Sequence, residues 1–79
     1  MARIKVEKTS EGPVPSEVLV QIPTVEGPED VVVHQSQVDD KGIEVGYIGD
    51  KGENALVELP RETVSGRWRV WVPKKLVAA

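Results

Sequence analysis

The chain has 79 residues, a net charge of −3, no cysteine and no phenylalanine, and valine is its most frequent apolar residue. This length predicts one domain, residues 1–79. The lack of cysteine excludes disulfides and zinc–thiolate sites, and the acidic balance disfavours duplex DNA, whose affinity comes largely from phosphate neutralisation. Valine favours strands, because β-branched side chains lose rotamer freedom in helices.

The N-terminal residues lack the apolar run of a signal peptide, and no apolar run is long enough to cross a bilayer, so we expect a cytoplasmic protein.

The first part of the chain predicts two short strands separated by loops. Residues 3–8 alternate apolar and charged side chains, which is typical of a strand at a sheet edge. Residues 9–16 contain glycine and prolines and predict a loop. Residues 17–22 predict a strand that stops at Pro23, because a proline cannot donate to a ladder. Residues 24–30 then predict a second, acidic loop.

The middle of the chain predicts two strands joined by a tight turn. Residues 31–38 begin with apolar side chains on both faces, and residues 39–42 (DDKG) are a turn signal. Residues 43–48 alternate as a strand does, and residues 49–53 predict another turn. The side chains of this second strand that we expect to face inward are Ile43, Val45 and Tyr47.

Residues 54–60 and 67–73 predict the clearest hairpin. Both alternate apolar and polar positions, and their apolar faces must coincide because a one-residue slip would turn one set to water. The register that satisfies this condition places Ala55 opposite Val72, Val57 opposite Val70 and Leu59 opposite Trp68. On the outer face it places Leu56 opposite Trp71 and Glu58 opposite Arg69, which are favourable cross-strand pairs.

Taken together, the pattern predicts an all-β fold. Five to six short antiparallel strands with tight turns indicate a small barrel or sandwich of SH3-like or oligonucleotide-binding-like type. From about Val31 to Val72 the strands are expected to follow one another as a meander. The tail, residues 73–79, is expected to form one turn of 3₁₀ or α-helix.

The outer face of the C-terminal hairpin is the best candidate for a binding surface. Its predicted site residues are Leu56, Arg67, Arg69, Trp71, Lys74 and Lys75. Aromatic and arginine side chains dominate interface energetics, so we predict a non-catalytic domain that binds a protein partner, which includes a second copy of itself. The alternative is single-stranded nucleic acid, with a base stacked on Trp71 and phosphates on the four cations. A plainer interpretation is that Trp71 only covers Leu56.

We expect no enzyme, no metal and no cofactor. On a strand, His34 and Ser36 would share a face at a spacing of roughly 6–7 Å, too long for the hydrogen bond that a nucleophile and its base require. Asp39 and Asp40 lack the spacing of a calcium loop and predict only a turn.

Four glycines, Gly42, Gly46, Gly49 and Gly52, follow each other at short intervals. A nucleotide-binding loop requires a helix after the glycines, and none is predicted here. Gly46 falls inside a predicted strand, where glycine marks a bulge or a close approach of another backbone.

The hairpin sequence resembles the C-terminal end of many small, uncharacterised bacterial and phage β proteins. The matching residues are ALVEL at 55–59 and WVPK at 71–74, followed by Leu76 and Val77, with Lys75 where those proteins usually have serine. The resemblance implies a terminal β-hairpin and names no activity.

Overall fold

The computed structural model describes residues 2–12 and 14–78, and confirms the all-β prediction, with about 61% of the chain in strands. In chain order the strands are β1 (Ala2–Ile4), β2 (Glu7–Glu11), β3 (Glu17–Thr24), β4 (Gly27–His34), β5 (Val38–Asp39), β6 (Gly42–Lys51), β7 (Asn54–Glu58), β8 (Arg69–Pro73) and β9 (Val77–Ala78). Two 3₁₀ turns, η1 (Gln35–Gln37) and η2 (Lys74–Leu76), precede β5 and β9. No helix in the described ranges is long and apolar enough to cross a membrane.

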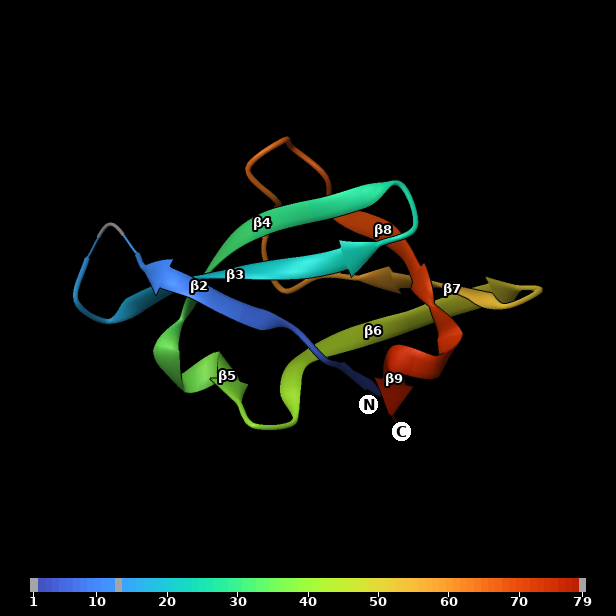
Figure 1. Ribbon diagram of the computed structural model, residues 1–79, viewed down its shortest axis with the longest axis horizontal. Coiled ribbons are helices and arrows are strands. Elements are labelled where there is room, and N and C mark those ends of the chain that lie inside the picture. Colours follow the sequence, from blue (N-terminus) through green and yellow to red (C-terminus); the bar gives the residue numbers. More distant parts are fainter. Residues whose placement is uncertain (1, 13, 79) are drawn as a thin grey trace.

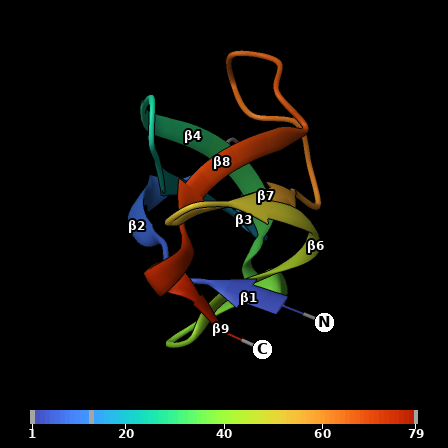
Figure 2. The same cartoon turned by 90° about the vertical axis from the view of Figure 1, so that its right-hand side faces the viewer.

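The strands form two antiparallel sheets that pack face to face (Figures 1 and 2). One sheet has the order β2-β3-β4, and the other has the order β8-β7-β6-β1-β9 with β5 added beside β6. In Figure 2 the first sheet lies on the left, and β6 and β7 lie on the right. The described strands do not close into one hydrogen-bonded barrel, so the architecture is a sandwich.

The core lies between the sheets and consists mainly of valine and isoleucine. In β3 every second residue is buried, as expected for a strand with one face against a core. The side chains that are almost completely buried are Ile4, Val20, Ile22, Val31, Val33, Ile43, Val57, Val70 and Val72. Burying one such side chain stabilises the fold by about 1.5–3 kcal/mol. A valine-rich core thus suffices without phenylalanine.

The predicted register of the C-terminal hairpin is confirmed from Ala55↔Val72 through Glu58↔Arg69. The prediction for Trp68 is wrong in one respect. The backbone of Trp68 does accept a hydrogen bond from Leu59 N–H at 2.8 Å, but its side chain is 53% exposed, whereas Leu59 is buried. The reason is that β8 begins only at Arg69, so Trp68 lies beyond the part of the strand that faces the core.

The acidic loop predicted at residues 24–30 is wrong, because β3 and β4 form a long hairpin there. β3 continues past Pro23 to Thr24, and β4 already begins at Gly27. Pro23 and Pro28 lie opposite each other, one pair away from the turn. In an antiparallel ladder alternate pairs exchange no hydrogen bonds, so two prolines that cannot donate are tolerated at such a pair. The predicted loop at residues 9–16 is also shorter, since β2 extends to Glu11.

The meander predicted from residue 31 holds from β5 to β8, and β5 pairs with β6 across the predicted turn at residues 39–42. β4 pairs with β3 and does not pair with the next strands along the chain. After His34 the chain leaves the first sheet, passes through η1 and joins the second sheet at β5. Residues 31–38, predicted as one strand, are therefore divided between the two sheets.

β6 connects the two halves of its sheet. Its first half pairs with β1, and its second half, from Gly46, pairs with β7. The register shifts between Tyr47 and Gly49, just after Gly46, which the sequence marked as a position for a bulge. Tyr47, expected to face inward, pairs with the buried Val57 but is 45% exposed.

The predicted 3₁₀ turn in the tail is confirmed as η2. Beyond it, β9 pairs with β1, with Arg3 opposite Ala78 and Ile4 opposite Val77. This pairing brings the two ends of the chain side by side (Figure 1). The sequence does not reveal this pairing, because β1 has three residues and β9 has two, and such short strands do not show which strand they pair with.

We predict that Gly42→Ala destabilises the fold by ~3 kcal/mol or more, measured by urea unfolding. Gly42 has φ +102°, and an added Cβ would lie 1.8 Å from the Ile4 carbonyl oxygen, so the β1–β6 pairing must separate. Gly52→Ala is the matched control: Gly52 has φ +60° with nothing within 4 Å, and its replacement should cost only about 1 kcal/mol. Equal losses in the two variants would contradict this account.

Candidate interaction surface

The outer face of β6, β7 and β8 carries the predicted pair Leu56 and Trp71. The register aligns Gly49, Leu56 and Trp71 in one row across the three strands. Both apolar side chains are half-buried. Trp71 therefore does not belong to the core, and it covers Leu56 only in part. A large aromatic ring remains accessible on this face.

Most cations of the predicted site are paired with carboxylates. Arg67, Arg69, Lys74 and Lys75 are all exposed. The ion pairs are Arg67 with Glu26 at 2.6 Å, Arg69 with Glu58 at 3.1 Å and Lys74 with Asp50 at 3.6 Å. Within the described side chains Lys75 has no carboxylate at ion-pair distance. Exposed ion pairs add little stability. They do lower the net positive charge of this face.

The tip of the β3–β4 hairpin extends the surface beside Trp71. Val25 N–H donates a hydrogen bond to the Trp71 carbonyl at 2.9 Å, and the Val25 side chain is 45% exposed. The next residue, Glu26, holds Arg67. The sequence does not predict this contribution, because residues 24–30 predict a loop, which has no defined position.

A shallow hollow lies next to Trp71 at the end of the β6–β7 hairpin. Its volume is about 590 Å³, and it is lined by Lys51, Gly52, Glu53, Asn54 and Trp71. The lining places charges of both signs around one aromatic ring. Such a hollow is large enough for a single side chain of a partner.

Tyr47 and Asp50 form the best-defined polar contact of this region. The Tyr47 hydroxyl donates to Asp50 Oδ2 at 2.6 Å. This hydrogen bond, followed by the charge of Lys74, lowers the pKa of Asp50. The same hydrogen bond raises the pKa of Tyr47. At the β3–β4 hairpin tip, Arg67 donates a hydrogen bond to Glu26, and this bond together with the negative charge of Glu26 raises the pKa of Arg67.

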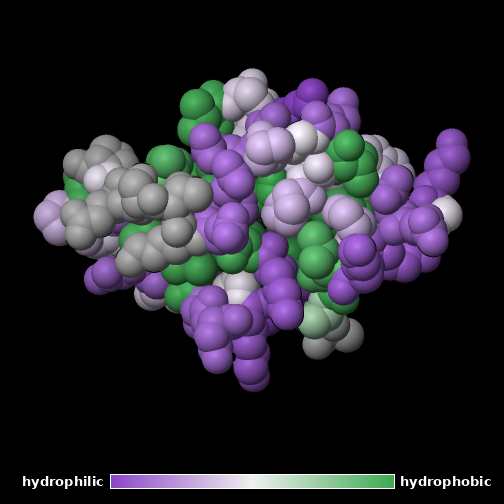
Figure 3. Space-filling view, in the orientation of Figure 1, coloured by the Kyte–Doolittle hydropathy of each residue, from purple (hydrophilic) through white to green (hydrophobic). Residues whose placement is uncertain are grey.

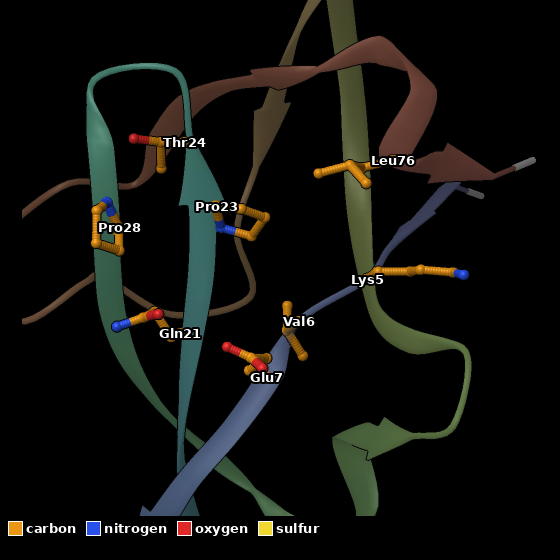
Figure 4. Close-up of a pocket in the computed structure, with 8 residues that line it drawn as sticks. All are labelled: Lys5, Val6, Glu7, Gln21, Pro23, Thr24, Pro28 and Leu76. Carbon is orange, nitrogen blue, oxygen red and sulfur yellow. The ribbon is translucent and has the colours of Figure 1, made fainter.

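A second hollow, of about 550 Å³, lies between the β1–β2 link, the β3–β4 hairpin and η2. Figure 4 shows Val6, Pro23 and Leu76 bordering one space, while the Lys5 side chain extends away from it. Thr24 and Gly27 O share a hydrogen bond at the hairpin end. The coloured part of the face in Figure 3 has apolar patches broken by polar residues. The sequence does not predict this hollow, because Pro23 is expected to end a strand and Pro28 to lie in a loop.

The prediction that His34 and Ser36 are too far apart to interact is wrong. The distance from His34 Nδ1 to Ser36 Oγ is 2.7 Å, because these residues begin a 3₁₀ turn and do not continue a strand. His34 Nδ1 also accepts the Ser36 N–H, and Gln37 Oε1 accepts the His34 N–H. The contacts form a capping box for η1. This local role explains the His–Ser pair without a catalytic one.

No group of three or more His, Cys, Asp or Glu among the described residues could hold a metal ion. In comparisons with known proteins, no family model, curated protein or solved structure matches this chain.

We predict that the phenol of Tyr47 ionises above its ordinary pKa and that Asp50→Asn lowers this pKa towards the ordinary value. A carboxylate that accepts the phenolic proton favours the neutral phenol, and the amide removes the negative charge. Absorbance at the tyrosinate band during an alkaline titration measures this directly, since Tyr47 is the only tyrosine. Because the folded pKa is raised, this contact stabilises the fold below the unfolded pKa and is lost as the pH rises through the folded pKa. An unchanged titration in Asp50→Asn would show that the hydrogen bond does not persist in solution.

Proposed function

We propose that this chain is a non-catalytic domain that binds a protein partner through the outer face of β7 and β8. The observation that carries the proposal is the half-buried Trp71, which lies beside Leu56 on the outer face of β7 and β8. An accessible aromatic at the centre of a surface is the typical anchor of a protein interface. A second copy of the chain is included among the partners.

The arrangement of charges supports a protein partner over nucleic acid. Three cations of the surface already have carboxylate partners, Glu26, Glu58 and Asp50. Phosphate groups would have to compete with these carboxylates, and the whole chain has a net charge of −3. A protein interface accommodates such a rim readily, because interfaces combine an apolar centre with a polar border.

The proposal includes a finer description of the fold as an SH3-like or oligonucleotide-binding-like sandwich that stays open. It is supported by the β6–β7–β8 meander and by the last strand, which returns after a 3₁₀ turn to pair with the first. In both fold types a sheet face and its neighbouring loops are available for ligands.

We predict that Trp71→Ala weakens partner binding by about 30-fold or more, the effect of removing a typical hot spot. Trp68→Ala is the matched control, because Trp68 is also exposed but lies outside the outer-face row. The measurement has two parts, sedimentation velocity over a range of concentrations for self-association, and affinity capture with quantitative mass spectrometry for other proteins. Circular dichroism verifies that both variants are folded.

The nucleic-acid alternative is tested with the same variants. Tryptophan fluorescence is titrated with a mixed-sequence single-stranded oligonucleotide at low and moderate salt. Quenching that falls with salt and disappears in Trp71→Ala would replace the protein-binding proposal by the nucleic-acid one. A partner captured equally well by the wild type and Trp71→Ala would show that this face is not the binding site.

A further inference from the structure

The tip of the β6–β7 hairpin has a fixed shape. Lys51 and Asn54 form the last pair of the ladder, so only Gly52 and Glu53 make the turn. Gly52 has φ +60° and Glu53 has no positive φ, which is the arrangement of a type II′ hairpin turn. The Glu53 carbonyl also accepts the Lys74 N–H at 2.7 Å. The turn is therefore held by its own backbone and by the start of η2.

Lys51 and Glu53 are charged side chains without a partner at this tip. In contrast, each of the four arginines has a carboxylate at ion-pair distance. Lys51 and Glu53 are both exposed, and neither forms an ion pair with any described side chain or with the other. Both line the hollow of about 590 Å³ beside Trp71. The hollow thus has one free ammonium group and one free carboxylate next to an aromatic ring.

Two free charges of opposite sign on one surface are complementary to a second copy of that surface. A partner group of a single charge sign would be attracted by one of the two side chains and repelled by the other. In a two-fold symmetric dimer every contact occurs twice with the roles exchanged. Lys51 of each copy then meets Glu53 of the other, and both charges of both copies are paired.

The position of the hairpin tip permits this contact. Figure 1 shows the β6–β7 hairpin extending at the right-hand end of the molecule, beyond β8 and the C-terminal turn. The residues around Trp71 that line the hollow belong to this tip, Lys51 through Asn54. Two copies can therefore approach each other at this end before any other element meets its counterpart.

We propose that this hollow is the contact site of a two-fold symmetric dimer, in which the ends of two β6–β7 hairpins meet. The inference rests on the proposed function and identifies the partner as a second copy of the chain. The Lys51 side chain of each copy occupies the hollow of the other, with its aliphatic stem on the Trp71 ring and its ammonium group facing Glu53. Trp71 supplies most of the affinity, and the charges select the partner, because exposed ion pairs alone add little.

The test uses the full chain and exchanges the two charges. Sedimentation velocity from about 1 μM to about 1 mM measures self-association of the wild type, Lys51→Glu, Glu53→Lys, the double variant with both changes, and an equimolar mixture of the two single variants. Lys41→Glu is the matched control, because Lys41 is an exposed lysine in another hairpin turn, without an ion-pair partner among the described side chains and outside the hollow. Circular dichroism verifies that every variant is folded.

We expect the wild type to dimerise and each single variant to dimerise about 30-fold more weakly or worse, because each substitution places like charges opposite each other at a contact that occurs twice. The mixture should dimerise again, since one chain then has glutamates at positions 51 and 53 and the other has lysines. The double variant should also dimerise, because its charges are only exchanged. Lys41→Glu should behave as the wild type does.

Several results would overturn the inference: a wild type that stays monomeric at about 1 mM, a mixture that does not regain dimerisation, or equal losses in Lys51→Glu and Lys41→Glu. In each of these cases the proposed function stands if Trp71→Ala weakens the capture of another protein, since that measurement needs no second copy. If Trp71→Ala changes neither self-association nor capture, both proposals are wrong.

Discussion

Two backbone hydrogen bonds between the sheets hold this small sandwich together at its outer strands. Val25 N–H at the β3–β4 hairpin tip donates to Trp71 O at the edge of β8, and Val64 N–H in the loop before β8 donates to Asp30 O at the edge of β4. Each sheet thereby covers an edge of the other. A chain of this length has few strands with which to protect edges, so mutual covering replaces closure of a barrel. The hairpin and the loop must consequently have fixed lengths.

The loop before β8 has a fixed shape because of Thr63, a buried polar residue. Its N–H donates to Arg67 O, and its hydroxyl accepts the Arg67 N–H, so the loop closes on itself. Gly66 provides the positive φ that the turn requires. Ser65 donates to Glu29 of β4, and that bond lowers the pKa of Glu29. The loop thus holds β4 by side chains as well as by the backbone, and it places Arg67 within reach of Glu26.

The sequence predicted those parts in which local pattern and burial coincide. In the β7–β8 hairpin two alternating strands have only one register that buries both apolar faces, and this register is the observed one. The pairing of β1 with β9 and the tie of Val25 to Trp71 depend on contacts distant in the chain, which periodicity does not record. Pro23 suggested a strand end and Pro28 a loop, since sequence does not show which pairs in a ladder exchange hydrogen bonds. For the candidate surface, the sequence predicts Leu56, Trp71 and the Glu58–Arg69 pair. It does not predict Glu26 and Asp50, which hold Arg67 and Lys74, because these carboxylates come from segments remote in the chain.

The same constraint explains why a face of this domain, and not an edge, is available for a partner. The outer edges of β4 and β8 are covered, β2 is charged and has a register shift, and β9 has only two residues. Each remaining edge is therefore short, irregular or charged, which prevents pairing with another chain. On the outer face of β6–β8, in contrast, two strand positions lack side chains and an aromatic ring remains accessible. The fold thus protects most of its strand edges and leaves an accessible aromatic side chain, Trp71, on a sheet face, where a further strand cannot pair.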